Sequence, residues 1–209
     1  MLNTTFGRLS IGLSFAAVLL TASLAVAQPA QQPPQVRVRG VIEAVSDDSI
    51  TVHRKDGSSV TVQLTPKVVV NALVKASMED IKEGVFIGTT ALPTKDGALS
   101  AVEVHIFPES MRGAGEGHYP WDLEANSTMT NASVTHIVKK VKGSTFTLKY
   151  KGGETEVTVP AKATIVSVTP GSRDDLKAGA AVFSICAQLP DGSLKTGFLL
   201  VGRGVMPPM

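Results

Sequence analysis

Apolar and polar residues alternate in short runs along most of the chain, which is the pattern of β-strands. Residues 50–53 and 60–64 alternate on either side of the turn residues 55–58, and this predicts a β-hairpin. The pattern predicts further strands over 36–45, 68–70, 85–92 and 99–107, with a second hairpin turn at 95–97. Only one segment reads differently: Ser77 with Asp80 matches a capping box and Gly84 follows as a stop, so about one helical turn is expected there.

The second half of the chain repeats this order of elements. Residues 49–52 match 145–148, residues 60–62 match 157–159, and residues 79–84 match 174–179, at offsets between 95 and 97. The capping pair recurs as Ser172 with Asp175, and the late Asp-Gly turn recurs at 191–192. Matches that keep their order and spacing predict an internal duplication.

Each copy holds about five strands, with a short helix between the third and the fourth, as a small OB-like barrel requires. Closing such a sheet removes the exposed edges that short strands would present, and Gly40 can supply a bend in the first strand. We therefore predict an all-β protein of two tandem OB-like five-stranded barrels, over 36–107 and 134–205. Residues 108–133, which we call the join, are predicted to be an irregular linker containing aromatic residues. A two-sheet sandwich is the structural alternative.

The N-terminus has the pattern of a signal peptide. Residues 11–26 are apolar or small, and Ala25-Val26-Ala27 forms a cleavage signal before Gln28. A transmembrane anchor competes with this interpretation, but the small residues at its end favour cleavage. Residues 1–27 are thus a predicted signal peptide and 28–35 a Pro/Gln-rich tether. The expected product is a periplasmic or secreted monomer without a membrane span.

The chain resembles a family of exported bacterial domains of unknown function. The motifs shared with that family are residues 41–52, Lys55-Asp56-Gly57, Ile81-Lys82-Glu83-Gly84, residues 101–104, Leu176-Lys177-Ala178-Gly179 and, in the join, Met111-Arg112-Gly113, residues 115–118 and Pro120-Trp121-Asp122. The resemblance implies an envelope location, an OB-like fold and no established activity. Some members are labelled metal transporter permeases, but no segment after the signal peptide approaches a membrane span.

Composition narrows the functional classes. The 20 Lys+Arg nearly balance the 18 Asp+Glu, which argues against a dedicated polyanion binder. Few aromatic residues remain for stacking on bases, because four of the phenylalanines fall at apolar positions, so no nucleic-acid partner is expected. Those assigned to the core are Phe86, Phe146, Phe183 and Phe198. Cys186, the only cysteine, is interpreted as a small buried side chain.

No pattern of catalytic residues is present, so we expect no enzymatic activity. The paired carboxylates at 47–48 and 174–175 fall at turns or at a predicted helix start, where capping and solvation explain them. His53 and His105 fall on the polar side of strands and are interpreted as surface residues. No cofactor is predicted. The alternative is a divalent metal held by His118 with Glu116 and Asp122, where nearby glycines give the backbone freedom to wrap.

The join carries the least generic residues. Leaving Trp121 in water would forgo burial worth about 2–3 kcal/mol, so it is predicted to pack at the interface of the barrels. The join is then either a clasp or one wall of a binding site. The candidate ligand or interface residues are Arg112, Glu116, His118, Tyr119, Trp121 and Asp122.

The leading functional prediction is a non-catalytic periplasmic binding or interaction protein, whose partner is an unknown envelope protein or a small ligand. The first alternative is a metal-handling protein with a site near His118. The second is an envelope assembly scaffold that binds proteins by strand addition.

Overall fold

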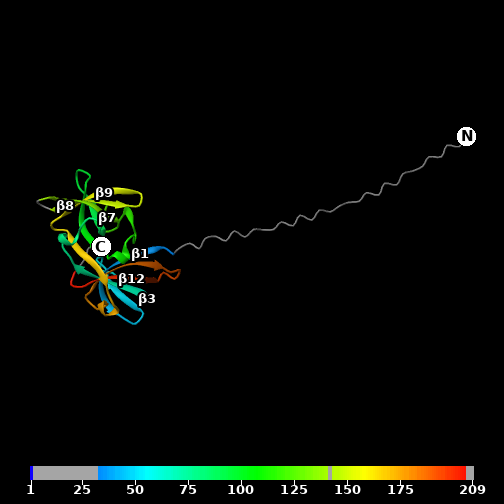
Figure 1. Ribbon diagram of the computed structural model, residues 1–209. Helices are drawn as coiled ribbons and strands as arrows, with labels where there is room; N and C mark the ends of the chain where they lie inside the picture. The colour runs from blue at the N-terminus through cyan, green and yellow to red at the C-terminus, as the bar shows by residue number, and fades with distance from the viewer. Residues whose placement is uncertain (2–32, 141–142, 206–209) are drawn as a thin grey trace. The chain divides into compact units, whose positions relative to one another are not determined.

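Strands make up most of the computed structural model, which describes residue 1, residues 33–140 and residues 143–205 (Figure 1). Apart from Met1, the predicted signal peptide with its cleavage point at Ala27 and Gln28 lies outside the described residues, as does the tether up to residue 32. The strands are β1 (Gln35–Val45), β2 (Ser49–His53), β3 (Ser59–Lys75), β4 (Phe86–Pro93), β5 (Leu99–Ile106), β6 (Gly117–Pro120), β7 (Thr128–Lys140), β8 (Gly143–Tyr150), β9 (Gly153–Pro160), β10 (Thr164–Pro170), β11 (Ala181–Gln188) and β12 (Leu194–Gly202). The predicted all-β class is confirmed.

Five of these strands close into a barrel. β2 lies between β1 and β3, β11 lies between β1 and β12, and β12 pairs in parallel with β3 to complete the ring. The closing contact runs from Leu194 opposite Val62 to Gly202 opposite Leu73. Because this contact is long, the barrel has no open seam between its third strand and its last.

The second strand group contains β5, β4, β7, β8 and β9, paired in that order. β9 meets β5 again in parallel, but only through Leu99 opposite Val157 and Ser100 opposite Thr158. β10 connects the group to the barrel, since it pairs antiparallel with β3 and parallel with β5. In Figure 1, β1, β3 and β12 lie together, and so do β7, β8 and β9.

The membership of the barrel differs from the predicted one. Its first three strands come from residues 35–75 and its last two from residues 181–202, so it is not made from 36–107 alone. The reason is that β3 does not turn back after Pro66. It runs on to Lys75 beside β10, and the chain then enters the second strand group at β4. The segment over 68–70, predicted to be a separate strand, is part of β3.

The register repeats between the two halves. Val69 of β3 lies opposite Phe198 of β12, and Thr164 of β10 lies opposite Glu103 of β5. Thr164 comes 95 residues after Val69, and Phe198 comes 95 residues after Glu103, so the two pairs are equivalent. The bulge between Ile42 and Ala44, where β1 meets β2, recurs between Val134 and His136, where β7 meets β8. The two strand groups therefore use the same pairing scheme.

Three buried apolar clusters accompany these groups. One fills the barrel and includes Ile42, Val52 and Cys186, whose burial was predicted. The second fills the other strand group around Phe146 and Leu148. The third lies outside the barrel, where β3, β10, β11 and β12 meet the join. Its buried members are Leu73, Val166, Val168, Phe183 and Leu200, and Trp121 packs against them.

The predicted short helices are only single 3-10 turns, η1 (Met78–Asp80) and η3 (Arg173–Asp175). Both predicted capping boxes are present, because the Asp80 and Asp175 carboxylates accept the N–H groups of Ser77 and Ser172, each at 2.8 Å. The chain returns to extended backbone at the next residue in each case, which ends the turn.

The join is more ordered than the irregular linker that was predicted. It contains a third 3-10 turn, η2 (Glu109–Met111), and the strand β6, and its last residues already belong to β7. β6 pairs with β7 over Thr128–Asn131, whereas β8 reaches β7 only as far as Ser133. β6 thus fills the strand edge that β8 leaves free.

Candidate functional site

The C-terminal part of the join is held on β1 of the barrel. The Asp122 carboxylate accepts a hydrogen bond from Arg39 at 2.7 Å and lies 3.6 Å from the Arg37 guanidinium. Arg37 in turn stacks on the Trp121 ring, 4.0 Å from its centroid, and the ring of Phe183 lies 6.1 Å away. Arg37 and Arg39 therefore each contact the join in two ways, through the charge of Asp122 and through the ring of Trp121.

The electrostatics of Asp122 agree with this arrangement. Burial raises the pKa of its carboxyl, but the hydrogen bond and charge of Arg39, together with the charge of Arg37, lower it further than burial raises it. The net result is a pKa below the ordinary value, which keeps Asp122 ionised and paired near neutral pH.

The N-terminal part of the join is held on the second strand group instead. The Glu116 carboxylate accepts the backbone N–H of Lys151 at 2.9 Å. The His118 ring stacks on Tyr150 with centroids 6.1 Å apart, and its Nδ1 lies 2.8 Å from the Thr130 hydroxyl. The join thus contacts both strand groups, each through its own residues.

The two remaining candidates support the join itself. Arg112 donates to the Gly84 carbonyl at 2.9 Å and to the Ser133 hydroxyl at 3.1 Å, and it pairs with Glu109. Tyr119 lies edge-on to Trp121 at 6.0 Å. Burial raises the pKa of the Tyr119 hydroxyl, which the nearby charge of Arg37 only partly offsets.

The hypothetical metal ligands are not brought together. Glu116, His118 and Asp122 bind the Lys151 backbone, Thr130 and the β1 arginines respectively. Over 33–140 and 143–205, no group of three or more His, Cys, Asp or Glu side chains is arranged to hold a metal ion. The candidate residues of the join are therefore engaged in contacts between chain segments.

A buried polar pair on β5 was missed by sequence reasoning. His105 was predicted to be a surface residue, but it is only 3% exposed, and its Nε2 lies 2.7 Å from the carboxylate of Glu103, which is fully buried. The prediction was wrong because β5 is covered on its polar side. Here His105 lies opposite Val166 of the third cluster. A signal was available in principle, since Glu103-Val104-His105 places two ionisable groups on one face of a strand.

A cavity of about 470 Å³, which we call the basic groove, lies where the barrel, the join and β5 meet. The barrel contributes β1, β2, β11 and β12, the join contributes Leu123 and Glu124, and β5 contributes Val102. Three cationic residues line the groove, namely Arg39, Arg54 and Lys55. Sequence reasoning assigned none of the three to a binding site, because they come together only when β1 and β2 meet the join.

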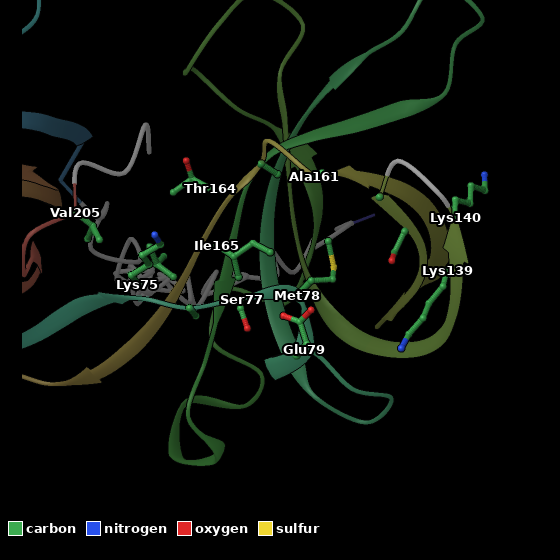
Figure 2. Close-up of a pocket in the computed structure, with 15 residues that line it drawn as sticks. Lys75, Ser77, Met78, Glu79, Lys139, Lys140, Ala161, Thr164, Ile165 and Val205 are labelled. Atoms are coloured by element: carbon green, nitrogen blue, oxygen red, sulfur yellow. The ribbon is translucent and has the colours of Figure 1, made fainter.

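A larger hollow of about 700 Å³ lies beside η1, the start of β8 and β10. Figure 2 shows Lys139 and Lys140 on one side of it and Lys75 on the other, with Met78 and Ile165 between them. Residues 141–142, which follow Lys140 in the sequence, lie outside the described residues, so the lining of this hollow is described only in part. We therefore assign no site to this hollow.

Comparison of the chain with protein-family models, with curated proteins and with solved structures found no match. Among the described residues, none of the helical segments has the length and apolar character needed to cross a membrane.

Proposed function

We propose that this protein is an exported, non-catalytic binding protein, built from two OB-like units that have exchanged their last two strands. The repeated register supports a duplicated origin, and each group joins three consecutive antiparallel strands to a parallel partner, as an OB-like unit does. The apolar segment over 11–26 with its Ala25-Val26-Ala27 exit supports export to the periplasm or medium.

The basic groove is the observation that carries this proposal. Its volume of about 470 Å³ suits a small ligand, and ligand pockets are common where two structural units meet. The groove draws its walls from both halves of the chain and from the join. In this proposal the join is a clasp that also completes the binding site, while its own candidate residues hold the two strand groups in place.

Ligand-observed NMR with a panel of small envelope compounds tests the proposal. The panel should include sugars, amino acids, short peptides and organic acids. We expect saturable binding of at least one class, with the compound recovered unchanged after long incubation. Binding of none would contradict the proposal, and so would steady turnover that is lost in His118→Ala but kept in His136→Ala. The second variant is a matched control, because His136 is exposed and outside the join.

A further inference from the structure

The basic groove has chemical features that narrow its ligand. Its cationic residues and His53 lie on β1, on β2 and in the turn after β2, Glu124 lies in the join, and most of the remaining lining is apolar. The apolar residues come from three different parts of the fold, and they include Val41 and Phe183 of the barrel, Val102 of β5 and Leu123 of the join. A ligand in this groove therefore meets an apolar surface on more than one side.

Carboxylates neutralise only some of the positive charges in the groove. Arg39 is paired with Asp122, and Glu124 contributes one negative charge to the lining. In the described part of the chain no carboxylate forms an ion pair with Arg54 or Lys55. The groove therefore keeps excess positive charge at the turn after β2.

Buried donors point to the same chemistry. The Nε atoms of Arg39 and Arg54 are both buried and have no hydrogen-bond partner among the described residues. A guanidinium presents its N–H groups as a planar fork that matches the oxygens of a carboxylate or phosphate. Because the Nε atoms themselves are covered, an oxyanion at this end of the groove would accept from the other N–H groups of a guanidinium.

We propose that the basic groove binds a small amphiphilic anion, with its oxyanion head at Arg54 and Lys55 and its apolar body along Val102, Leu123 and Phe183. This inference rests on the proposed binding function and adds the class of ligand. The shared chemistry is one oxyanion on an apolar body, which a fatty acid and an alkyl phosphate both provide.

Titration with decanoate and decyl phosphate, both below their micelle concentrations, tests the inference. Trp121 is the only tryptophan, and its ring is close to both Arg39 and Phe183 of the groove, so its fluorescence can report binding. We expect saturable binding of one or both anions, which shows the preferred head group. Decanol, which lacks the charge, and inorganic phosphate, which lacks the apolar body, should bind at least tenfold more weakly.

Variants locate the head group. Arg54→Gln should weaken anion binding at least tenfold, and Lys55→Gln severalfold. Lys67→Gln, which removes the same charge from an exposed position on β3, should leave binding within twofold. Lys55 is exposed, so its variant keeps the test valid if Arg54→Gln does not fold.

Three outcomes would overturn the inference: decanol binding as tightly as decanoate, anion binding insensitive to both groove variants, or no response to either anion. The broader binding proposal fails separately, when no compound of the NMR panel binds. Binding of an uncharged compound alone would keep the binding function and reject the anion.

Discussion

The barrel and the second strand group follow one pairing scheme, yet they differ in which strands close them. In the barrel the single strand β3 makes the whole parallel contact with β12. In the second group the equivalent contact with β5 is divided between β9, at Leu99 and Ser100, and β10, over residues 103–106. At the barrel's end, Arg173 donates to the Asp47 carbonyl at 2.6 Å. The equivalent position beside the other group is Met78, which lines the larger hollow instead.

The same contrast holds outside the barrel, where the third cluster lies. Phe198 and Leu200 of β12 pack there, but at the equivalent positions of β5, 95 residues earlier, the chain has Glu103 and His105. One copy of the scheme thus has apolar side chains where the other buries a polar pair. A shared backbone register therefore does not fix the chemistry of the surfaces it presents.

The largest expected effect comes from breaking the buried polar pair. His105→Leu should lower the free energy of unfolding by about 3–5 kcal/mol, because it leaves the fully buried Glu103 without its partner. The double variant Glu103→Leu/His105→Leu should recover most of that loss, since it makes β5 resemble β12. Urea unfolding of both variants measures the difference, and a double variant as unstable as the single one would contradict the idea.

A smaller effect is expected in the bend of β1. A Cβ on Gly40 would lie 2.0 Å from the carbonyl oxygen of His53, so Gly40→Ala should destabilise the protein by about 1–3 kcal/mol. The equivalent residue of β7 is Ala132, which lies opposite Ile87 as Gly40 lies opposite Val182. Ala132→Gly is the matched control and should cost about 0.5–1 kcal/mol. Thermal unfolding of Gly40→Ala and Ala132→Gly measures the two losses of stability. Equal losses would contradict the prediction that Gly40 is the more sensitive position.

The smallest effect concerns the ion pair of Arg203 with Asp175, for which Asp80, the equivalent of Asp175, shows no counterpart among the described residues. Arg203 holds Asp175 at 2.7 Å and, with the Ser172 backbone N–H, lowers the Asp175 pKa from 3.8 to about 2. Because the folded-state pKa is depressed, the stabilisation is present above about pH 4 and is lost as the pH falls toward 2.

Arg203→Gln should therefore lower stability at pH 7 only slightly, because the Arg203 side chain is partly exposed and water screens the ion pair. The loss of stability between pH 4 and pH 2 should also become shallower. Urea unfolding at a series of pH values checks both effects, with Lys67→Gln as the control for removal of one positive charge. An unchanged acid limb in Arg203→Gln would show that the Ser172 contact alone sets this pKa.

The sequence predicted the strands well, because alternation and turn residues are local signals. One exception was Ser59–Lys75, which was predicted as separate strands over 60–64 and 68–70 but is a single strand. Which strands share a barrel could not be predicted. The two halves of the sequence have similar patterns, so the sequence of β12 suits pairing with β3 and pairing with β9 equally well. Only the path of β3 determines that β12 pairs with β3.

The candidate site was harder still. Trp121 and Asp122 stood out as unusual residues in the join, but their partners Arg37 and Arg39 looked like the polar side of an ordinary strand. His105 looked exposed for the same reason. Burial of a polar strand face depends on what covers it, and here β10, almost sixty residues further along the chain, lies beside His105.

The barrel takes its strands from two distant parts of the chain, and this has a consequence for how the chain must fold. The contact that closes the barrel joins residues about 130 positions apart, so it cannot form until nearly the whole described chain is available. Contacts of such long range make folding slow. A cut in the join would leave two fragments, each supplying strands to both groups, and such fragments would have to recombine to regain the fold. We therefore expect the described chain to unfold as one cooperative unit, although its sequence pattern is that of two.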